Sequence, residues 1–256
     1  MKTLLILLFL PLSLLAQENP FEKKLPFKEA IIEYALAGNQ KGVETLYIKD
    51  FGKQRVLYTN TNSKIISKSK EQLTLITPKW VYSLTKNSNT ASRVPNLNYL
   101  LYIRYQELSD TEKEKVLKNL KIINYMPIQG SRFKIEKNFT DINKISCNQL
   151  IQKSKKECYG YDGSLLLKSE IKFLGFNKSK ILTNIFETKV DPALFSLKDY
   201  EIKDNKIKSV QEYEKSKKII DFLKRNINTK TIFIKTKNSH DYNQDIQEGI
   251  KALKKI

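Results

Sequence analysis

Short segments in which apolar and polar residues alternate make up much of the chain between residues 42 and 198. A period of two is typical of strands that bury one face. Turn residues separate these segments: Asp50-Phe51-Gly52-Lys53 places Gly at a tight position, and Pro78 lacks the N–H that a central ladder needs. The pattern predicts five strands in the first part of this region, over Val43–Lys49, Arg55–Thr59, Leu73–Ile76, Trp80–Thr85 and Arg132–Lys137.

The clearest hairpin lies at 156–173, around Asp162-Gly163, which is a preferred pair for a two-residue type I′ turn. After a connection at 175–178, a further strand over Lys180–Val190 gives an antiparallel meander. Alternate positions of the strand that follows the turn share one face, and these are Leu165, Leu167, Ser169, Ile171 and Phe173.

One helix is predicted between the strands. Ser109-Asp110-Thr111-Glu112 forms a capping box, in which the Ser hydroxyl accepts from the Glu112 N–H and the Glu side chain reaches back. Pro127 ends the segment. An apolar stripe follows the capping box and indicates that this helix lies across a sheet face; it consists of Val116, Leu117, Leu120 and Ile123.

The segments at either end of this region have a helical period. Residues 17–41 form a lead-in segment in which Lys28–Ala37 is expected to be helical, because apolar residues recur there at helical spacing. After Asp199 the chain becomes strongly basic. We expect a separate α-β-α extension over 199–256, with a helix over Lys206–Lys224, a strand over Thr231–Thr236 and a helix over Asp241–Ile256.

The first sixteen residues have the three-part pattern of a secretory signal peptide. Lys2 precedes an almost unbroken apolar run that stops at Ala16, after which the chain turns polar. This pattern predicts export to the periplasm and cleavage after Ala16, with an uncleaved membrane anchor as the alternative. No Cys follows Ala16, so the protein is not expected to be a lipoprotein. After residue 16 no apolar run approaches the 18 residues of a membrane-spanning helix.

The chain of 256 residues is strongly basic, with 46 Lys and Arg residues against 27 Asp and Glu residues and a formal net charge of +19. Such a charge suits nucleic acid, but only five of the basic residues are Arg, the side chain best suited to bidentate phosphate contacts. The Lys residues are also spread along the whole chain. We therefore expect a solvated basic surface or contact with an anionic membrane or envelope polymer, and no nucleic acid.

Cys147 and Cys158 are the two cysteines of the chain. In an exported protein such a pair predicts a disulfide. A metal site would need more Cys and His than this chain has, because its one histidine is His240, and no cofactor is expected. Ser239, His240 and Asp241 are neighbours in sequence, which does not make a catalytic triad. We expect a turn that caps the last helix there, and no enzymatic activity; a hydrolase is the less favoured alternative.

The residues 147–197 carry a resemblance to a known family. The cysteine pair precedes Gly160-Tyr-Asp-Gly-Ser-Leu-Leu-Leu-Lys168, and the region closes on Leu194-Phe-Ser-Leu197, which resembles periplasmic proteins of the LolA/LolB-like lipoprotein-carrier fold. The earlier segments 42–49 and 77–82 look like the first strands of such domains, so the resemblance covers about residues 42–198. It implies a strongly curved, incomplete β-barrel that holds acyl chains between its sheet and its helices.

These observations lead to a fold of the α+β class, mainly antiparallel β: an incomplete barrel with helices on its concave face and a basic C-terminal extension. The expected function is binding of a lipid, a lipoprotein acyl chain or another apolar ligand in the groove of this half-barrel. An alternative is an envelope interaction module whose basic helices bind anionic lipid or a protein partner. Eight apolar residues are the candidate ligand lining, with an ordinary packed core as the alternative for each: Trp80, Tyr82, Phe133, Leu165, Leu167, Ile171, Phe173 and Phe186.

Overall fold

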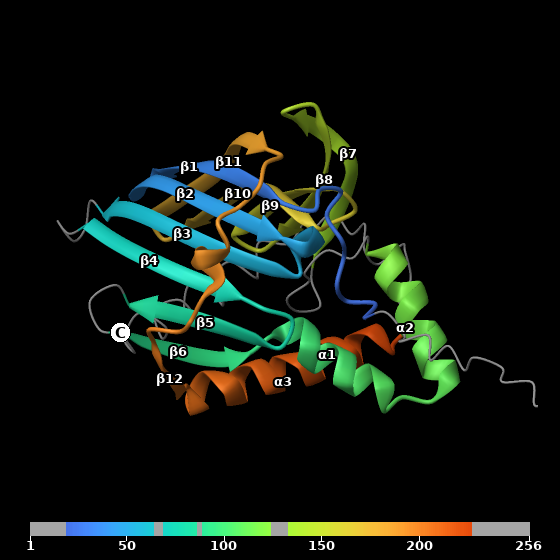
Figure 1. The fold of residues 1–256 in the computed structure, drawn as a ribbon. Coiled ribbons are helices and arrows are strands. Elements are labelled where there is room, and N and C mark those ends of the chain that lie inside the picture. The colour runs from blue at the N-terminus through green and yellow to red at the C-terminus, as the bar shows by residue number, and fades with distance from the viewer. Residues whose placement is uncertain (1–18, 64–68, 86–88, 124–132, 227–256) are drawn as a thin grey trace, which may run out of the picture.

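Twelve strands form a single, strongly curved sheet in the computed structural model, which describes residues 19–63, 69–85, 89–123 and 133–226 (Figure 1). The strands are β1 (Ala30–Gly38), β2 (Gln40–Lys49), β3 (Gln54–Ser63), β4 (Ser69–Ile76), β5 (Trp80–Thr85), β6 (Thr90–Pro95), β7 (Lys134–Ile142), β8 (Ile145–Gln152), β9 (Lys155–Gly160), β10 (Leu165–Phe173), β11 (Phe176–Phe186) and β12 (Glu201–Asp204).

The sheet has the order β12-β6-β5-β4-β3-β2-β1-β11-β10-β9-β8-β7, and among the described residues its two edge strands do not pair with each other. All neighbours are antiparallel except β12 and β6, which are parallel. The sheet is therefore open, and the expected α+β class with an incomplete, mainly antiparallel barrel is confirmed.

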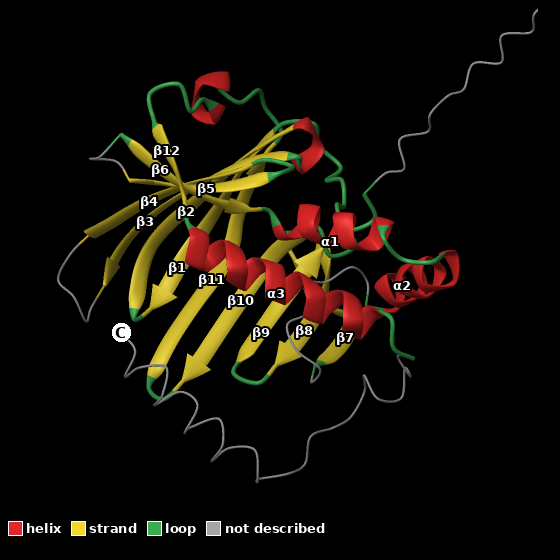
Figure 2. Ribbon diagram, turned by 90° about the horizontal axis from the view of Figure 1, so that it is seen from below, coloured by secondary structure: helices red, strands yellow, loops and turns green. Residues whose placement is uncertain are grey.

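Three α-helices lie on one side of this sheet: α1 (Leu97–Gln106), α2 (Asp110–Ile122) and α3 (Lys206–Leu223). Figure 2 shows α3 crossing the sheet with α1 beside it and α2 near its end. The opposite face of β3 to β6 is covered by the segment around the short 3-10 helix η2 (Pro192–Phe195). A second 3-10 turn, η1 (Asp50–Gly52), joins β2 to β3.

The helix expected over Lys28–Ala37 is wrong, because this segment is strand β1 in the middle of the sheet, between β2 and β11. Its buried side chains alternate: Ala30, Ile32, Tyr34 and Leu36. The other face of β1 is half-buried and also carries apolar residues. The sequence therefore does not show a clear period of two. A strand with two covered faces and a helix are hard to distinguish by periodicity alone.

The other expected strands are found. Val43–Lys49, Arg55–Thr59 and Leu73–Ile76 lie within β2, β3 and β4, and Trp80–Thr85 is β5. Of the strand expected over Arg132–Lys137, residues 134–137 belong to β7, and the described Phe133 precedes it. The Asp162-Gly163 turn is also confirmed, since both residues have positive φ and the Ser164 N–H donates to the Tyr161 carbonyl oxygen over 3.1 Å.

The strand expected over Lys180–Val190 begins earlier and ends earlier than predicted, because β11 spans Phe176–Phe186. The chain reverses at Leu174-Gly175, directly after β10, where both residues have positive φ. This tight turn leaves residues 176–179 free to pair with β10. Leu174 is an unusual residue for a left-handed conformation, so the sequence pattern places the turn too late.

The expectation of a single helix between the strands is wrong as well, because α1 precedes the predicted α2. The α1 sequence, LNYLLYIRYQ, is apolar around much of its circumference and contains several residues that favour strands. Asn96 provides the start signal, since its side-chain oxygen accepts from the Asn98 N–H over 3.0 Å. Strands β6, β8 and β12 are also not predicted by the sequence pattern.

Several expectations fall on residues outside the described ranges: the signal peptide at 1–16, Pro127, His240, the strand Thr231–Thr236 and the helix Asp241–Ile256. The helix expected over Lys206–Lys224 is confirmed as α3. Within the described residues, no helix combines the length and the apolar character needed to cross a bilayer.

Candidate functional site

A cleft with a volume of about 920 Å³ lies between the three helices and the sheet. We call it the helix–sheet cleft. Its walls come from α1, α2 and α3, from the beginning of β3, the end of β9, the beginning of β10 and the turn between β9 and β10, and from the residues before β1. Its volume falls in the range of ligand sites in proteins, roughly 300–1,000 Å³.

One wall of the cleft is apolar. Helix α1 contributes Leu97 and Leu101, β10 contributes Leu166, and Phe21 approaches from the N-terminal segment. The rest of this wall comes from α2, α3 and β9 and consists of Leu120, Ile123, Tyr159, Val210, Ile219, Phe222 and Leu223. These side chains leave an apolar surface that an acyl chain or another hydrophobic group can cover.

The capping box of α2 sets the direction of this helix. The Ser109 hydroxyl oxygen accepts from the Glu112 N–H over 3.5 Å, and the Glu112 carboxylate accepts from the Ser109 N–H over 3.1 Å. As a result the predicted apolar stripe faces the sheet. Val116 in this stripe is fully buried, and Leu120 and Ile123 also line the cleft.

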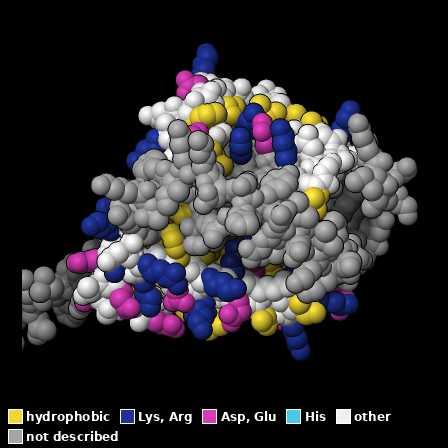
Figure 3. All heavy atoms as spheres, turned by 180° about the vertical axis from the view of Figure 1, so that it is seen from behind, with side chains coloured by type: hydrophobic (Ala, Val, Ile, Leu, Met, Phe, Trp, Pro, Cys, Tyr) yellow, Lys and Arg dark blue, Asp and Glu magenta, His cyan; other side chains and the backbone are white. Residues whose placement is uncertain are grey.

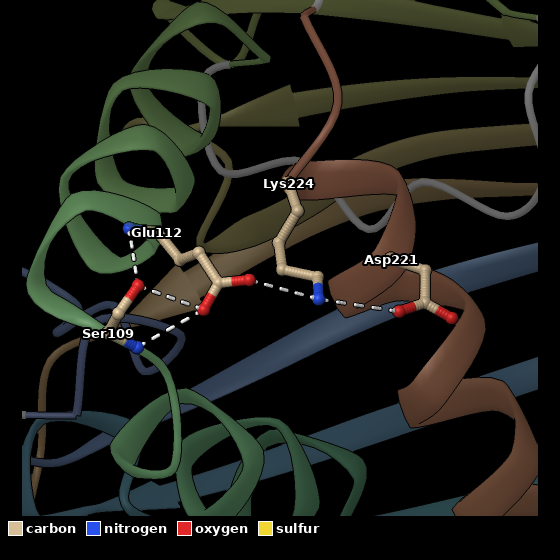
Figure 4. Close-up of polar contacts among 4 residues, drawn as sticks. All are labelled: Ser109, Glu112, Asp221 and Lys224. Atoms are coloured by element: carbon tan, nitrogen blue, oxygen red, sulfur yellow. Dashed lines mark hydrogen bonds and ion pairs between the residues drawn. The ribbon is translucent and has the colours of Figure 1, made fainter.

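The end of α3 is fixed to α2 by polar contacts (Figure 4). Lys224 Nζ lies 3.3 Å from Glu112 Oε1 and 4.0 Å from Asp221 Oδ1. Further along α2, the buried Asn119 amide donates to the carbonyl oxygens of Leu223 and Arg225, over 2.6 and 2.8 Å. These contacts satisfy free carbonyl groups at the end of α3 and hold that helix over the cleft.

The remaining wall of the cleft is charged, and basic side chains outnumber acidic ones. Glu214 and Asp221 are the acidic residues of the lining; the basic residues are Lys23, Arg55, Lys215, Lys218 and Arg225. Lys215 Nζ lies 3.7 Å from the Glu212 carboxylate, so part of this charge is paired. The cleft thus joins an apolar surface to a basic one.

Arg55 is the basic lining residue that the sheet contributes. It lies on β3, and its Nε donates to the Gly52 carbonyl oxygen over 2.8 Å. Burial lowers the pKa of the guanidinium, and the Glu22 carboxylate raises it in part. Gly52 has a φ of +91°, and a Cβ there would lie 3.1 Å from Arg55 Nη2 and from Leu25 Cδ1. The left-handed turn η1 therefore needs a glycine where the arginine packs against it.

The side chain of Tyr159 is an uncharged phenol in the apolar wall. Its hydroxyl donates to the Glu157 carboxylate over 3.0 Å, and Lys155 Nζ lies 2.7 Å from the same carboxylate. Burial raises the pKa of the Tyr159 phenol, and the Glu157 charge raises it further. Tyr159 is therefore neutral throughout the physiological range, and its ring acts as an apolar surface.

A second smaller cavity, of about 330 Å³, adjoins the helix–sheet cleft. The two share four lining residues, Lys23, Arg55, Leu97 and Asn98. The smaller cavity is more polar, since Glu22, Lys53 and Asn96 also line it. Arg55 thus stands where an apolar space meets a polar one.

The predicted lining residues lie in several different environments. Leu165 and Leu167 are fully buried in a core cluster with Ile32 and Leu182. Trp80 and Tyr82 pack in another cluster beneath the η2 segment, as part of the opposite sheet face. The structure brings the members of each pair together but keeps the two pairs apart.

The other four predicted residues are also dispersed. Phe133 packs edge-on against Phe222, with ring centroids 5.9 Å apart, and Phe186 on β11 is 49% exposed. Ile171 and Phe173 are half-buried on β10. None of the eight is among the described residues that line the helix–sheet cleft; a role for them in ligand binding stays a prediction.

The predicted disulfide is present. It joins Cys147 on β8 to Cys158 on β9, whose Cα atoms are 5.5 Å apart, and both residues are buried in the core cluster that contains Leu165 and Leu167. It therefore fixes the strands next to the cleft without contributing to its wall. Within the described residues no group of three or more His, Cys, Asp and Glu side chains could hold a metal ion.

The sequence reasoning missed the residues that α1, α3 and the N-terminal segment bring to the cleft. Ile219, Phe222 and Leu223 belong to α3, whose amphipathic pattern is visible in the sequence but suggests a separate extension. Leu166 falls on the polar face of its strand by simple alternation. The alternation holds in the structure, because Leu165, Leu167 and Ser169 are buried and Leu166 is half-buried on the other face of β10. Leu166 therefore reaches the cleft from the face that its charged neighbours mark as polar in the sequence.

No family model and no curated protein matches the sequence. Solved structures with some similarity include an uncharacterized conserved protein from Thermus thermophilus, at 9% identity over 70% of this chain and 92% of that one, with a TM-score of 0.41. LprF from Mycobacterium bovis has 8% identity over 65% and 88% of the two chains and a TM-score of 0.26. A LolA superfamily protein from Nitrosomonas europaea has 11% identity over 70% and 94% and a TM-score of 0.23. With TM-scores below 0.5, the function has to be inferred from the cleft itself.

Proposed function

We propose that this protein is an exported, non-enzymatic binding protein that holds a lipid acyl chain or a similar apolar ligand in the helix–sheet cleft. The observation that supports the proposal is the set of apolar side chains that α1, α2, α3, β9 and β10 bring to a space of about 920 Å³. Each methylene group buried there would contribute roughly 0.8 kcal/mol to binding. Export rests on the signal-peptide pattern at residues 1–16.

Displacement of a fluorescent fatty acid from the mature protein tests this proposal. The wild-type protein is expected to bind the probe saturably, and Leu166→Trp, which fills the cleft from β10, is expected to weaken binding. Ile202→Trp is the matched control, because Ile202 is 42% exposed on β12 and does not line the cleft. Circular dichroism checks that both variants fold. Equal binding by both variants would contradict the assignment of the cleft.

A second candidate function is contact with an anionic membrane surface through α3. Ile207, Val210 and Tyr213 lie three residues apart along the helix and are 76, 63 and 53% exposed. They share one side of the helix, and Lys residues flank them. Exposed apolar residues next to basic ones are the pattern of helices that lie in a membrane interface.

Co-sedimentation with vesicles tests the second function. Vesicles that contain phosphatidylglycerol are expected to bind the protein at low salt and to release it at high salt, and Ile207→Asp is expected to weaken binding. Figure 3 shows Lys and Arg side chains over much of the described part of one face, with Asp and Glu between them. Ile181→Asp, at a 41% exposed position on β11, therefore serves as the control for general surface charge.

A further inference from the structure

Arg55 is a cation in an unusual place, since it lies where the helix–sheet cleft meets the smaller polar cavity and lines both. Lys23 lines both spaces as well, so two basic side chains stand at the junction. A charge that is partly withdrawn from water is costly unless opposite charges or hydrogen bonds compensate it. The hydrogen bond from Arg55 Nε reaches only a neutral oxygen, the carbonyl of Gly52.

The carboxylate that interacts with the Arg55 charge is itself partly buried. The Glu22 carboxylate attracts Arg55 and lines the smaller cavity. Its own pKa is raised, mainly because it is buried, although Arg55 and Lys53 lower it and Asp50 raises it further. The space beside Arg55 is the two adjoining cavities that it lines, and Arg is the side chain whose geometry best fits a carboxylate or phosphate group.

We propose that the ligand of the cleft is an amphiphile with one anionic headgroup, a carboxylate or a phosphate, and that the headgroup binds to Arg55 and Lys23 at the junction of the two cavities. This inference rests on the proposed function and adds the chemical class of the ligand. The apolar chain lies along Leu97, Leu101 and Leu166 in the larger space, and the headgroup points toward the smaller one.

The geometry explains why both ends of such a ligand are accommodated. Leu97 lies at the junction and Leu101 lies one turn further along α1, so the apolar wall begins directly beside the two cations. The basic residues Lys215, Lys218 and Arg225 also line the larger space, which favours anions over cations along the path into the cleft. A neutral amphiphile of the same length would use only the apolar wall.

Competition binding with matched ligands tests the inference. Dodecanoate, dodecyl phosphate and dodecanol share one chain and differ in the headgroup, and inorganic phosphate supplies the anion alone. The two anionic amphiphiles are expected to bind about tenfold or more tightly than dodecanol, as a charge-assisted hydrogen bond would give. Inorganic phosphate is expected not to displace the probe.

Variants test whether Arg55 and Lys23 cause the preference for anionic amphiphiles. Arg55→Gln is expected to remove most of the difference between dodecanoate and dodecanol, and Arg55→Lys, which keeps the charge, is expected to retain a part of it. Lys23→Gln, on the segment before β1, reduces the difference without disturbing the Gly52 contact and serves if Arg55→Gln does not fold. Lys172→Gln is the matched control, because this exposed Lys on β10 lies outside both cavities.

The outcomes separate the inference from the proposed function. Equal binding of dodecanoate and dodecanol to the wild-type protein would contradict the inference of an anionic headgroup. It would not contradict binding of an apolar chain in the cleft. If none of the amphiphiles binds, the proposed function itself is wrong. Displacement by inorganic phosphate alone would show a site for free anions and would overturn the amphiphile. A preference that survives in both Arg55→Gln and Lys23→Gln would place the headgroup elsewhere.

Discussion

Lys224 Nζ at the end of α3 lies 3.3 Å from Glu112 Oε1 in the first turn of α2, so the carboxylate that completes the capping box also holds the helix that covers the cleft (Figure 4). The two helices are far apart in sequence. Their contact therefore couples the local start signal of α2 to the position of α3.

The N-cap of α2 is expected to contribute about 1 kcal/mol to the free energy of unfolding, which is the typical loss when an N-cap side chain is removed. Ser109→Ala removes the hydroxyl that accepts from the Glu112 N–H. The free energy of unfolding in urea measures the change. Thr111→Ala, at an exposed position in the same turn, is the control. An equal loss in both variants would show that the cap contributes nothing specific.

The stabilisation that Glu112 provides is expected to disappear in acid. Its hydrogen bond from the Ser109 N–H lowers the pKa of this carboxyl, and Lys224 lowers it further. Because the pKa is lower in the folded protein, the stabilisation is fully present above the unfolded-state pKa and is lost as the pH falls through the folded-state pKa. Melting temperatures of the wild type and Glu112→Gln should differ at neutral pH and converge in acid; a constant difference would contradict the assignment.

The disulfide is expected to stabilise the fold by about 2–3 kcal/mol, as loop-closure entropy predicts for a loop of this size. Cys147 and Cys158 are separated by 11 residues and join neighbouring strands of the core. The double variant Cys147→Ala/Cys158→Ala should show this loss in urea unfolding. A reductant should destabilise the wild type and have no effect on the double variant; the same response in both proteins would argue against the bond.

The parts of the fold that the sequence predicted are those with local signals. Strong alternation indicated β2 to β5 and β10, the Asp162-Gly163 pair indicated the hairpin, and the Ser109–Glu112 box indicated α2. Strand β1 resembles a helix in sequence because tertiary contacts cover both of its faces. The parallel pairing of β12 with β6 depends on a long connection, and no local pattern reports it.

The cleft was harder to predict than the fold, because it depends on how distant segments meet. The sequence indicated that helices cover a curved sheet, which is the setting of the cleft. It did not indicate that α3 would lie beside α1, nor that Leu166, on the face of β10 opposite Leu165 and Leu167, would line the cleft. Arg55 looked like one of many basic residues until the fold placed it beside Lys23 and Leu97.

Two neighbouring leucines distinguish the cleft from the core. Leu167 is fully buried, so Leu167→Ala is expected to cost about 2–5 kcal/mol of stability. Leu166 is half-buried on the cleft wall, so Leu166→Ala should cost less stability and change ligand binding instead. Urea unfolding and binding of the fluorescent fatty acid measure both effects. If Leu167→Ala alone altered binding in a stably folded protein, the ligand would lie on the other side of β10.

Native mass spectrometry of the mature protein, purified from the envelope fraction of its own host, shows whether the helix–sheet cleft holds a ligand. We expect a species heavier than the polypeptide, whose added mass is released into organic solvent and contains an acyl chain with an acidic headgroup. Cleft-filling Leu166→Trp should reduce the occupied fraction. A bare polypeptide in every preparation, with the Cys147–Cys158 bond intact, would contradict ligand binding in the cleft and favour the surface of α3 as the functional site.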